Sequence, residues 1–224
     1  MTDEMVKRVL DILLSFIGLM VASPVFLILA IITGCSSRGG VFFRGPRVGK
    51  NGKEFRIFKF RSMVKDAEGH GKWNVGDKDP RITKWGHFLR KTKLDELPQL
   101  INVFLGQMSF VGPRPELRVY TDMYTEKEIK ILDNRPGITD WASMANIAQY
   151  KVFTAAEDPD KAYLESVRPL KLKLQLYYHD NNNLWIDFEI LVLTVLKVIF
   201  RFRKLPKGPQ KVIDDYVKEH EHAE

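Results

Sequence analysis

The chain has 224 residues, of which 35 are Lys or Arg and 28 are Asp or Glu, so its net charge is +7. This length suits one compact domain, and the positive charge predicts a negatively charged partner such as anionic lipid or a phosphorylated substrate. No nucleic acid is expected as a partner, because the sequence has no zinc-finger spacing, no basic region with heptads and no ribonucleoprotein signature. The single cysteine, Cys35, excludes an intramolecular disulfide and is typical of a reducing compartment.

A mostly apolar run extends from Ile12 to Ile32 and is interrupted near its middle by Ser23 and Pro24. A continuous helix over this run would be about 31 Å long at about 1.5 Å per residue, enough to cross the hydrocarbon core of a bilayer. Proline has no N–H and clashes with the carbonyl four residues before it, so we expect a kink or a break at Pro24. The Ser23 hydroxyl is one group that can satisfy the backbone freed there.

Cations flank the apolar run on both sides. Lys7 and Arg8 precede it, and it is followed by Arg38, Arg44, Arg47 and Lys50. Because such cations normally stay on the cytoplasmic side, the charges favour a re-entrant helix-break-helix that returns to the cytoplasm. A kinked single span and a cleaved signal peptide are the alternatives. The domain division is therefore a re-entrant membrane helix over 1–35, a compact cytoplasmic domain over 36–205 and a polar, disordered C-terminal tail over 206–224.

The fold class expected for the cytoplasmic domain is α+β and mostly helical, with one small β-hairpin. Residues 41–60 contain Asn51-Gly52, which accepts the positive φ values of a hairpin turn. Apolar spacing predicts helices over 81–90 and from residue 97 to about 106. A capping box, Thr125-x-x-Glu128, predicts a further helix.

Two segments near the C-terminus leave alternatives open. Residues 170–178 fit an alternating strand and a helical stripe about equally, and the helix formers before them favour the helix. Residues 184–205 are apolar with cations gathered at their end, a pattern that suits an interfacial amphipathic helix touching lipid. A buried core helix is the competing interpretation of that segment.

The candidate chemistry lies at two adjacent carboxylates, Asp95 and Glu96. Pro98 is tolerated only in the first turn of a helix, which places both carboxylates at a helix N-terminus, where the helix dipole lowers a carboxylate pKa. A plain capping role is one interpretation. Nearby cations favour a site instead, since Arg90 lies upstream and Arg114 lies downstream in the rigid turn Gly112-Pro113-Arg114-Pro115. A nucleophilic carboxylate beside one that holds Mg²⁺ suits attack on a diphosphate.

At this point the chain resembles the bacterial sugar transferases that act on polyprenyl phosphate, and in size the small monotopic phosphoglycosyl transferases. The resemblance rests on motifs that occur in one order between about residues 3 and 200. They are Ser23-Pro24, Phe58-Lys59-Phe60-Arg61-Ser62-Met63, Leu89-Arg90, Leu94-Asp95-Glu96-Leu97-Pro98-Gln99-Leu100, Met108-Ser109-Phe110-Val111-Gly112-Pro113-Arg114-Pro115 and Arg135-Pro136-Gly137-Ile138-Thr139.

The resemblance implies a two-step transfer. Asp95 would attack the β-phosphate of a UDP-sugar and release UMP, and polyprenyl phosphate, such as undecaprenyl phosphate, would then take the sugar phosphate from Asp95 to start a surface glycan. Glu96 would bind Mg²⁺, the one cofactor implied. Lys59, Arg90 and Arg114 would hold phosphate groups.

Ser23 and Pro24 match the break that makes the family's membrane helix re-enter, which implies a monotopic protein at the cytoplasmic face of the bacterial inner membrane. The chain departs from the family pattern after Trp141, where an Asn-Gly-Arg-type segment is replaced by residues 144–148. Either another cation, Arg135 or Arg168, takes the place of the missing arginine, or the nucleotide-sugar site is built differently.

The alternative function is a noncatalytic basic module that binds anionic membrane lipid through its apolar segments and its charge. The carboxylate pair and the proline-locked arginine favour the enzyme, because a lipid-binding module needs neither. The sequence identifies neither the sugar nor the oligomeric state. A homodimer is one of the assemblies that it leaves open.

Overall fold

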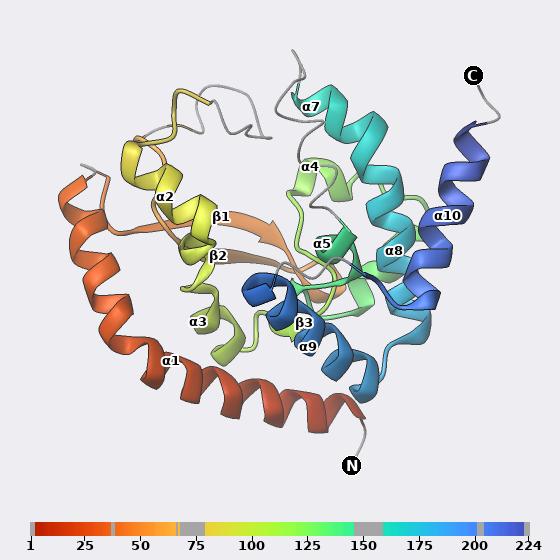
Figure 1. Ribbon diagram of the computed structural model, residues 1–224, viewed down its shortest axis with the longest axis horizontal. Helices are drawn as coiled ribbons and strands as arrows, with labels where there is room; N and C mark the ends of the chain where they lie inside the picture. The colour runs from red at the N-terminus through yellow and green to blue at the C-terminus, as the bar shows by residue number, and fades with distance from the viewer. Residues whose placement is uncertain are drawn as a thin grey trace.

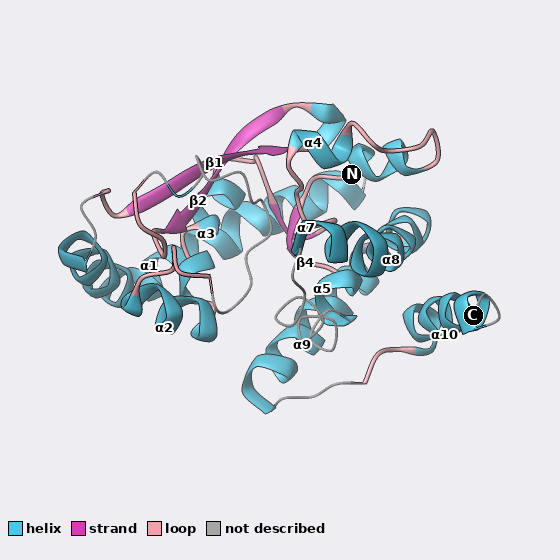
Figure 2. Ribbon diagram, turned by 90° about the horizontal axis from the view of Figure 1, so that it is seen from above, coloured by secondary structure: helices cyan, strands magenta, loops and turns pink. Residues whose placement is uncertain are grey.

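The computed structural model describes residues 3–36, 39–65, 67, 79–145, 159–200 and 204–221. Helices dominate, and the strands form two small sheets, as expected for the α+β class (Figure 2). In chain order the elements are α1 (Asp3–Ser36), β1 (Phe42–Val48), η1 (Lys50–Gly52), β2 (Glu54–Phe60), α2 (Lys84–Thr92), η3 (Leu94–Glu96), α3 (Gln99–Phe104), β3 (Ser109–Val111), α4 (Arg118–Thr121), η4 (Glu128–Asp133), β4 (Gly137–Thr139), α5 (Trp141–Ala145), α7 (Pro159–Ala162), η5 (Tyr163–Val167), α8 (Arg168–Asn181), α9 (Leu184–Phe200) and α10 (Lys207–Glu221).

Helix α1 is continuous through Pro24, so the expected division into two helices is wrong. Figure 1 shows α1 bending around one side of the molecule. The Ser23 Oγ donates to Met20 O at 2.8 Å, which is the carbonyl that the missing N–H of Pro24 would have used. This confirms that Ser23 satisfies the freed backbone group. Within the described residues, α1 is the one helix long and apolar enough to cross a membrane.

Strands β1 and β2 form the expected antiparallel hairpin. Asn51 and Gly52 have φ values of 56° and 72°, as their predicted turn role requires, although the turn spans residues 49–53. Helix α3 is attached to the hairpin by Asn102, a side chain with no exposed surface. Its amide accepts from Phe58 N at 2.8 Å and donates to Arg56 O at 2.9 Å.

The second sheet is a parallel pair, β3 and β4, between the hairpin and the C-terminal helices (Figure 2). Its two glycines permit a close backbone crossing. A Cβ on Gly112 would lie 2.2 Å from Arg135 O, and one on Gly137 would lie 2.1 Å from Gly112 N. The turn after β3 can therefore pass directly against the start of β4 only if both residues are glycine.

The largest core cluster packs α5, α8 and α9 against one another and against β3. In α8, Leu170, Leu174 and Tyr178 are buried at helical spacing, which confirms the helix over the strand. In helix α9, Ile190 is fully buried and Ile186, Leu191 and Leu193 pack against the core cluster, which confirms the core contact of the competing interpretation. Other apolar side chains of α9 are exposed, and the expected contact with lipid stays a prediction.

Two further sequence predictions meet the structure here. The capping box forms as expected, since Thr125 N donates to Glu128 Oε2 at 2.8 Å and Glu128 N donates to Thr125 Oγ1 at 3.4 Å, although η4 is a 3₁₀ helix. The disorder predicted for 206–224 is wrong over 207–221, which form helix α10. Helix α10 packs on α8 through Val212, Ile213 and Tyr216, an apolar stripe too sparse to stand out in a polar sequence.

We predict that Asn102→Ala lowers the free energy of unfolding by roughly 2–4 kcal/mol, because it leaves Phe58 N, Arg56 O and the Gln107 side chain without a buried partner. Thermal unfolding followed by tryptophan fluorescence measures the loss. Asn181→Ala is the matched control, since that exposed amide makes one contact, to Tyr177 O, and is expected to cost less than about 0.5 kcal/mol. Equal costs for the two variants would contradict the role given to Asn102.

Candidate active site

The two carboxylates lie in η3, a single 3₁₀ turn between α2 and α3. Helix α2 begins at its N-cap Thr83 and ends at Lys93, whose φ of 61° turns the chain sharply into η3. Asp95 and Glu96 therefore precede the first turn of α3 rather than occupying it. The Glu96 and Leu97 amides are already bonded to the carbonyls of Lys93 and Leu94, so the free helix N-terminus expected there is not formed.

Glu96 is held by two cations from distant segments. Lys59 Nζ of β2 donates to Glu96 Oε1 at 2.9 Å, and Arg114 Nη2 donates to the same oxygen. The Glu96 side chain is 15% exposed, and those of Lys59 and Arg114 are 21% and 32% exposed. The structure thus brings together Glu96, Lys59 and Arg114 as the sequence predicted, in an ion-pair cluster rather than a helix cap.

The adjacent carboxyl groups are shifted in opposite directions. Burial raises the pKa of Asp95, the Lys59 charge counteracts this and the Glu96 charge adds to it. Burial also acts to raise the pKa of Glu96, but Arg114 and Lys59 outweigh it and hold that pKa well below its usual range. The lowered pKa expected for both carboxylates is therefore wrong for Asp95, which is 6% exposed and whose pKa is raised mainly by burial.

Asp95 keeps unused bonding capacity. Its Oδ1 is buried without a hydrogen-bond partner in the described part of the chain. Gln99, the first residue of α3, is fully buried, and neither polar atom of its amide has a hydrogen-bond partner in the described part of the chain. Buried polar atoms are normally satisfied, so this region has donors and acceptors available for a bound molecule or for water.

Arg114 is positioned by contacts on three sides of its turn. Besides Glu96, its Nη1 donates to Ile138 O at 3.3 Å, and its backbone N donates to Asp140 Oδ2 at 3.1 Å. Asp140 is fully buried and also accepts from Gln175 Nε2 at 2.9 Å and from Ser143 N at 2.6 Å. Sequence reasoning missed this role of Asp140, for which the N-cap spacing to Ser143 was the available signal.

A second buried charge pair lies directly after the arginine turn, and the sequence reasoning missed it. Glu116 Oε1 accepts from Lys171 Nζ of α8 at 2.5 Å and from the Tyr163 hydroxyl. Glu116 Oε2 accepts from the Tyr124 hydroxyl at 3.2 Å. Burial raises the pKa of Tyr163 to about 12, so its hydroxyl remains a donor to this carboxylate. The pair ties the residue after Pro115 to the helical core.

The remaining predicted cations are placed differently. Arg90 lies on α2, close enough for its charge to lower the pKa of Asp95. Arg135 does not join the carboxylates; it lines a polar cavity of about 150 Å³ beside the start of α1. Arg168 donates to Tyr120 O at 3.2 Å and lies over the Tyr124 ring. Of residues 144–148, which stand in place of the Asn-Gly-Arg-type segment, 146–148 lie outside the described residues.

The residues around Asp95 suit a metal ion that is held by carboxylates together with substrate phosphates and water. Within the described residues, no group of three or more His, Cys, Asp or Glu could hold a metal ion. Mg²⁺ does not need such a cage, because it usually takes one or two carboxylates together with substrate phosphates and water. The unpartnered Asp95 oxygen and the neighbouring Glu96 fit that arrangement.

Comparison with known proteins places this geometry in context. A family model described as bacterial sugar transferase matches residues 2–201. The chain is 37% identical over 201 residues to a UDP-N-acetylgalactosamine-undecaprenyl-phosphate N-acetylgalactosaminephosphotransferase of Aeromonas hydrophila, covering 88% of this chain and 44% of that protein. It is 40% identical over 200 residues to a UDP-glucose:undecaprenyl-phosphate glucose-1-phosphate transferase of Xanthomonas campestris pv. campestris, covering 86% and 38%.

A shorter relative matches along most of its length. An uncharacterized sugar transferase, EpsL of Bacillus subtilis (strain 168), is 34% identical over 195 residues, which cover 86% of this chain and 87% of that protein. The chain therefore spans less than half of the first two relatives and nearly all of the third.

We predict that Asp95→Asn raises the melting temperature at neutral pH by about 2 °C or more. The pKa of Asp95 is raised in the folded state, so ionisation above that pKa opposes folding; below the ordinary value of 3.8 both states are protonated and the effect disappears. The gain should therefore shrink as the pH falls. Calorimetry between pH 3 and pH 7 measures it.

Glu96→Gln supplies the control of opposite sign. The pKa of Glu96 is lowered in the folded state, so its ionised form stabilises the fold and its replacement should lower the melting temperature at neutral pH. A loss of stability in Asp95→Asn that does not change with pH would contradict the assigned pKa shift.

Proposed function

Because the chain belongs to the bacterial sugar transferase family, we propose that it transfers a sugar-1-phosphate from a UDP-sugar to polyprenyl phosphate and releases UMP. Undecaprenyl phosphate is the acceptor named for the Aeromonas and Xanthomonas relatives, and the reaction would start assembly of a surface glycan. One observation carries the proposal: a buried carboxylate with an unpartnered oxygen, Asp95, lies beside a carboxylate that is ion-paired to Lys59 and Arg114.

In the first step the Asp95 carboxylate attacks the β-phosphorus of the UDP-sugar. A new Asp95 O–P bond forms, the bond between the β-phosphorus and the bridging oxygen breaks, and UMP leaves with that oxygen. Burial raises the pKa of Asp95, which makes its carboxylate a more basic nucleophile than that of an ordinary aspartate. The charges of Lys59, Arg90 and Arg114 would stabilise the phosphate oxygens in this step.

In the second step a phosphate oxygen of the polyprenyl phosphate attacks the phosphorus held on Asp95. The Asp95 O–P bond breaks, the carboxylate is regenerated and the polyprenyl diphosphate sugar leaves. Because one carboxylate serves first as nucleophile and then as leaving group, donor and acceptor can use the same cationic surface in turn. This suits a site in which Arg114 is fixed by Glu96, Ile138 O and Asp140.

We propose Mg²⁺ as the cofactor, held by Glu96 with Asp95 close by. When bound, the ion would neutralise charge on the diphosphate of the donor. The ion pairs of Lys59 and Arg114 would keep Glu96 ionised and oriented, so that the protein offers a carboxylate of low pKa to the incoming metal and substrate.

The acceptor is a lipid, and the apolar surface of the molecule suits a membrane. Most of the apolar run in α1 is exposed, and so are Trp185, Phe188, Val198 and Phe200 of α9. We propose that α1, as one bent and unbroken helix, enters the bilayer from the cytoplasmic face and returns to it, and that α9 lies at the interface. This arrangement would hold Asp95 near the lipid phosphate, the depth at which the acceptor reacts.

We predict that Asp95→Asn lowers UMP release from a UDP-sugar by about 1,000-fold or more, because the nucleophile is lost. Glu96→Gln should lower it by about 100-fold or more through loss of electrostatic stabilisation. Glu54→Gln is the control, since that carboxylate makes an exposed ion pair with Arg118. A screen of UDP-sugars with undecaprenyl phosphate identifies the donor and supplies the assay.

The noncatalytic alternative makes a different prediction for the same proteins. A lipid-binding module would bind anionic vesicles in a salt-sensitive way, would be indifferent to changes at Asp95 and Glu96, and would release no UMP from any UDP-sugar. Wild-type turnover in Asp95→Asn would rule out the nucleophile assignment even if UMP is released.

We predict the topology from a single thiol placed at residue 2 by Thr2→Cys in a Cys35→Ser background. A re-entrant α1 leaves both of its ends in the cytoplasm, so a membrane-impermeant reagent should label this thiol only after the cells are permeabilised. Labelling of intact cells would support a spanning helix.

A further inference from the structure

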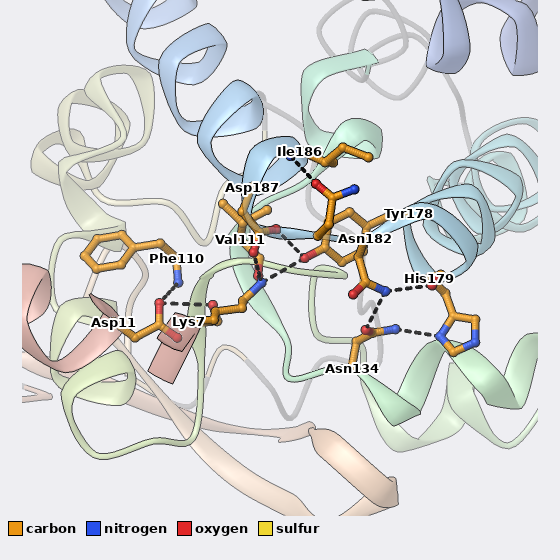
Figure 3. Close-up of polar contacts among 12 residues, drawn as sticks. Lys7, Asp11, Phe110, Val111, Asn134, Tyr178, His179, Asn182, Ile186 and Asp187 are labelled. Atoms are coloured by element: carbon orange, nitrogen blue, oxygen red, sulfur yellow. Dashed lines mark hydrogen bonds and ion pairs between the residues drawn. The ribbon is translucent and has the colours of Figure 1, made fainter. Parts of the chain in front are cut away.

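The first turns of α1 carry polar side chains that bond to the catalytic domain instead of facing lipid (Figure 3). Asp11 Oδ1 accepts from Phe110 N and from Ser109 Oγ, both at 3.1 Å. Arg8 donates to Val103 O at 2.7 Å and to Phe104 O at 2.9 Å, two carbonyls at the end of α3. The start of α1 is therefore bonded to β3 and α3 by side chains.

Lys7 makes the densest of these contacts. Its Nζ donates to Asp187 Oδ2 at 2.6 Å, to the Tyr178 hydroxyl at 2.8 Å and to Val111 O at 2.9 Å. The Tyr178 hydroxyl in turn donates to Asp187 Oδ1 at 2.6 Å, so the carboxylate is satisfied on both oxygens. Tyr178 is 2% exposed and Asp187 is 8% exposed. Figure 3 shows these groups converging from α1, β3, α8 and α9.

This geometry leaves Lys7 little to offer a lipid headgroup. A lysine ammonium has three donors, and all three are directed at protein acceptors. The charge of Lys7 is balanced by Asp187, so the pair contributes little net attraction to an anionic membrane. Lys50 offers a contrast, because it pairs with Glu4 of α1 at an exposed position.

The elements that Lys7 joins are those that set the height of the site over the membrane. Both α1 and α9 have exposed apolar faces, and β3 runs through Val111 and Gly112 into the turn that carries Arg114. We propose that Lys7 and Asp187 are positioning residues that lock the two lipid-facing helices to β3 and so fix the depth at which the lipid acceptor meets Asp95. This inference rests on the proposed function and adds to it a pair of residues that lie outside the ion-pair cluster.

The Lys7–Asp187 contact, called the lock below, should affect the two half-reactions differently. The contacts of Arg114 with Glu96, Ile138 and Asp140 do not involve Lys7, so the donor half-reaction should survive its loss. The acceptor approaches from the membrane, so its half-reaction should suffer when α1 and α9 can shift relative to β3. The test is therefore the KM for polyprenyl phosphate in lipid nanodiscs, compared with UMP release in a single turnover without acceptor.

We expect Lys7→Met and Asp187→Asn to raise the acceptor KM about tenfold while single-turnover UMP release stays within about twofold of wild type. Lys7→Arg should restore part of the loss because it keeps the charge and the donors. Tyr178→Phe is the milder variant; it removes one hydroxyl from the lock and should shift the KM in the same direction if Lys7→Met fails to fold. Lys50→Met is the matched control and should leave both half-reactions unchanged.

Flotation with vesicles that contain anionic lipid tests the membrane role of Lys7 directly. Binding equal to wild type in Lys7→Met supports the lock, whereas lost binding would show that Lys7 serves the membrane. An unchanged acceptor KM, or an equal loss in both half-reactions, would also overturn the proposal.

The lock can also be tested without enzymatic activity, so its failure can be distinguished from failure of the proposed function. If wild type releases no UMP from any UDP-sugar, the proposed function fails, and hydrogen exchange of the 108–112 peptide decides on the lock itself. Faster exchange in Lys7→Met than in Lys50→Met supports the lock, because Val111 and Phe110 lose the support of α1. Equal exchange in the two variants overturns it.

Discussion

The site depends on the two cations that share one oxygen of Glu96. Lys59 comes from the β-hairpin, Arg114 comes from the turn after β3, and Glu96 comes from the turn between α2 and α3. Removing such a carboxylate from water is costly, and the cost is recovered only when its partners are held in place. Each partner is held by a separate device: Asn102 joins the strand of Lys59 to α3, and Asp140 bonds to the backbone of Arg114.

The same cluster explains why neighbouring carboxylates differ. Glu96 contacts both cations directly, and its pKa is lowered. The pKa of Asp95 is raised because burial outweighs the charge of Lys59. Two adjacent acids in separate environments can divide the work, one as a nucleophile and one as an ionised ligand for metal. The division arises from which side chain reaches Lys59 and Arg114, and not from the helix terminus that the sequence suggested.

Turns, caps and hydrogen bonds between residues close in the sequence were predictable, and contacts between distant segments were not. The Asn51-Gly52 turn, the Thr125 capping box and the Ser23 bond at Pro24 each involve residues within a few positions of one another, and all form as predicted. The break predicted at Pro24 does not form, because a proline removes only one helical hydrogen bond and a helix can bend there without ending. The motifs also indicated that Glu96, Lys59 and Arg114 belong together.

The sequence predictions that the structure contradicts, and the residues that they missed, depend on contacts between distant segments. The pKa of Asp95 is set by burial, the position of Arg135 by the crossing of Gly112 and Gly137, and the order of α10 by packing on α8; none of these is encoded within one segment. Asn102 and Asp140 were missed because a single polar residue in a helix or after a strand carries no periodic signal. Their importance appears only when the groups they contact are known.

The central claim is that Asp95 carries the sugar phosphate between donor and acceptor. Mass spectrometry of the protein after incubation with its UDP-sugar and Mg²⁺, without lipid acceptor, tests this most directly. The account predicts a mass increase of one sugar phosphate on the peptide that contains Asp95, which disappears when polyprenyl phosphate is added. Product formation by the wild-type protein with no such adduct at any time in the reaction would contradict it.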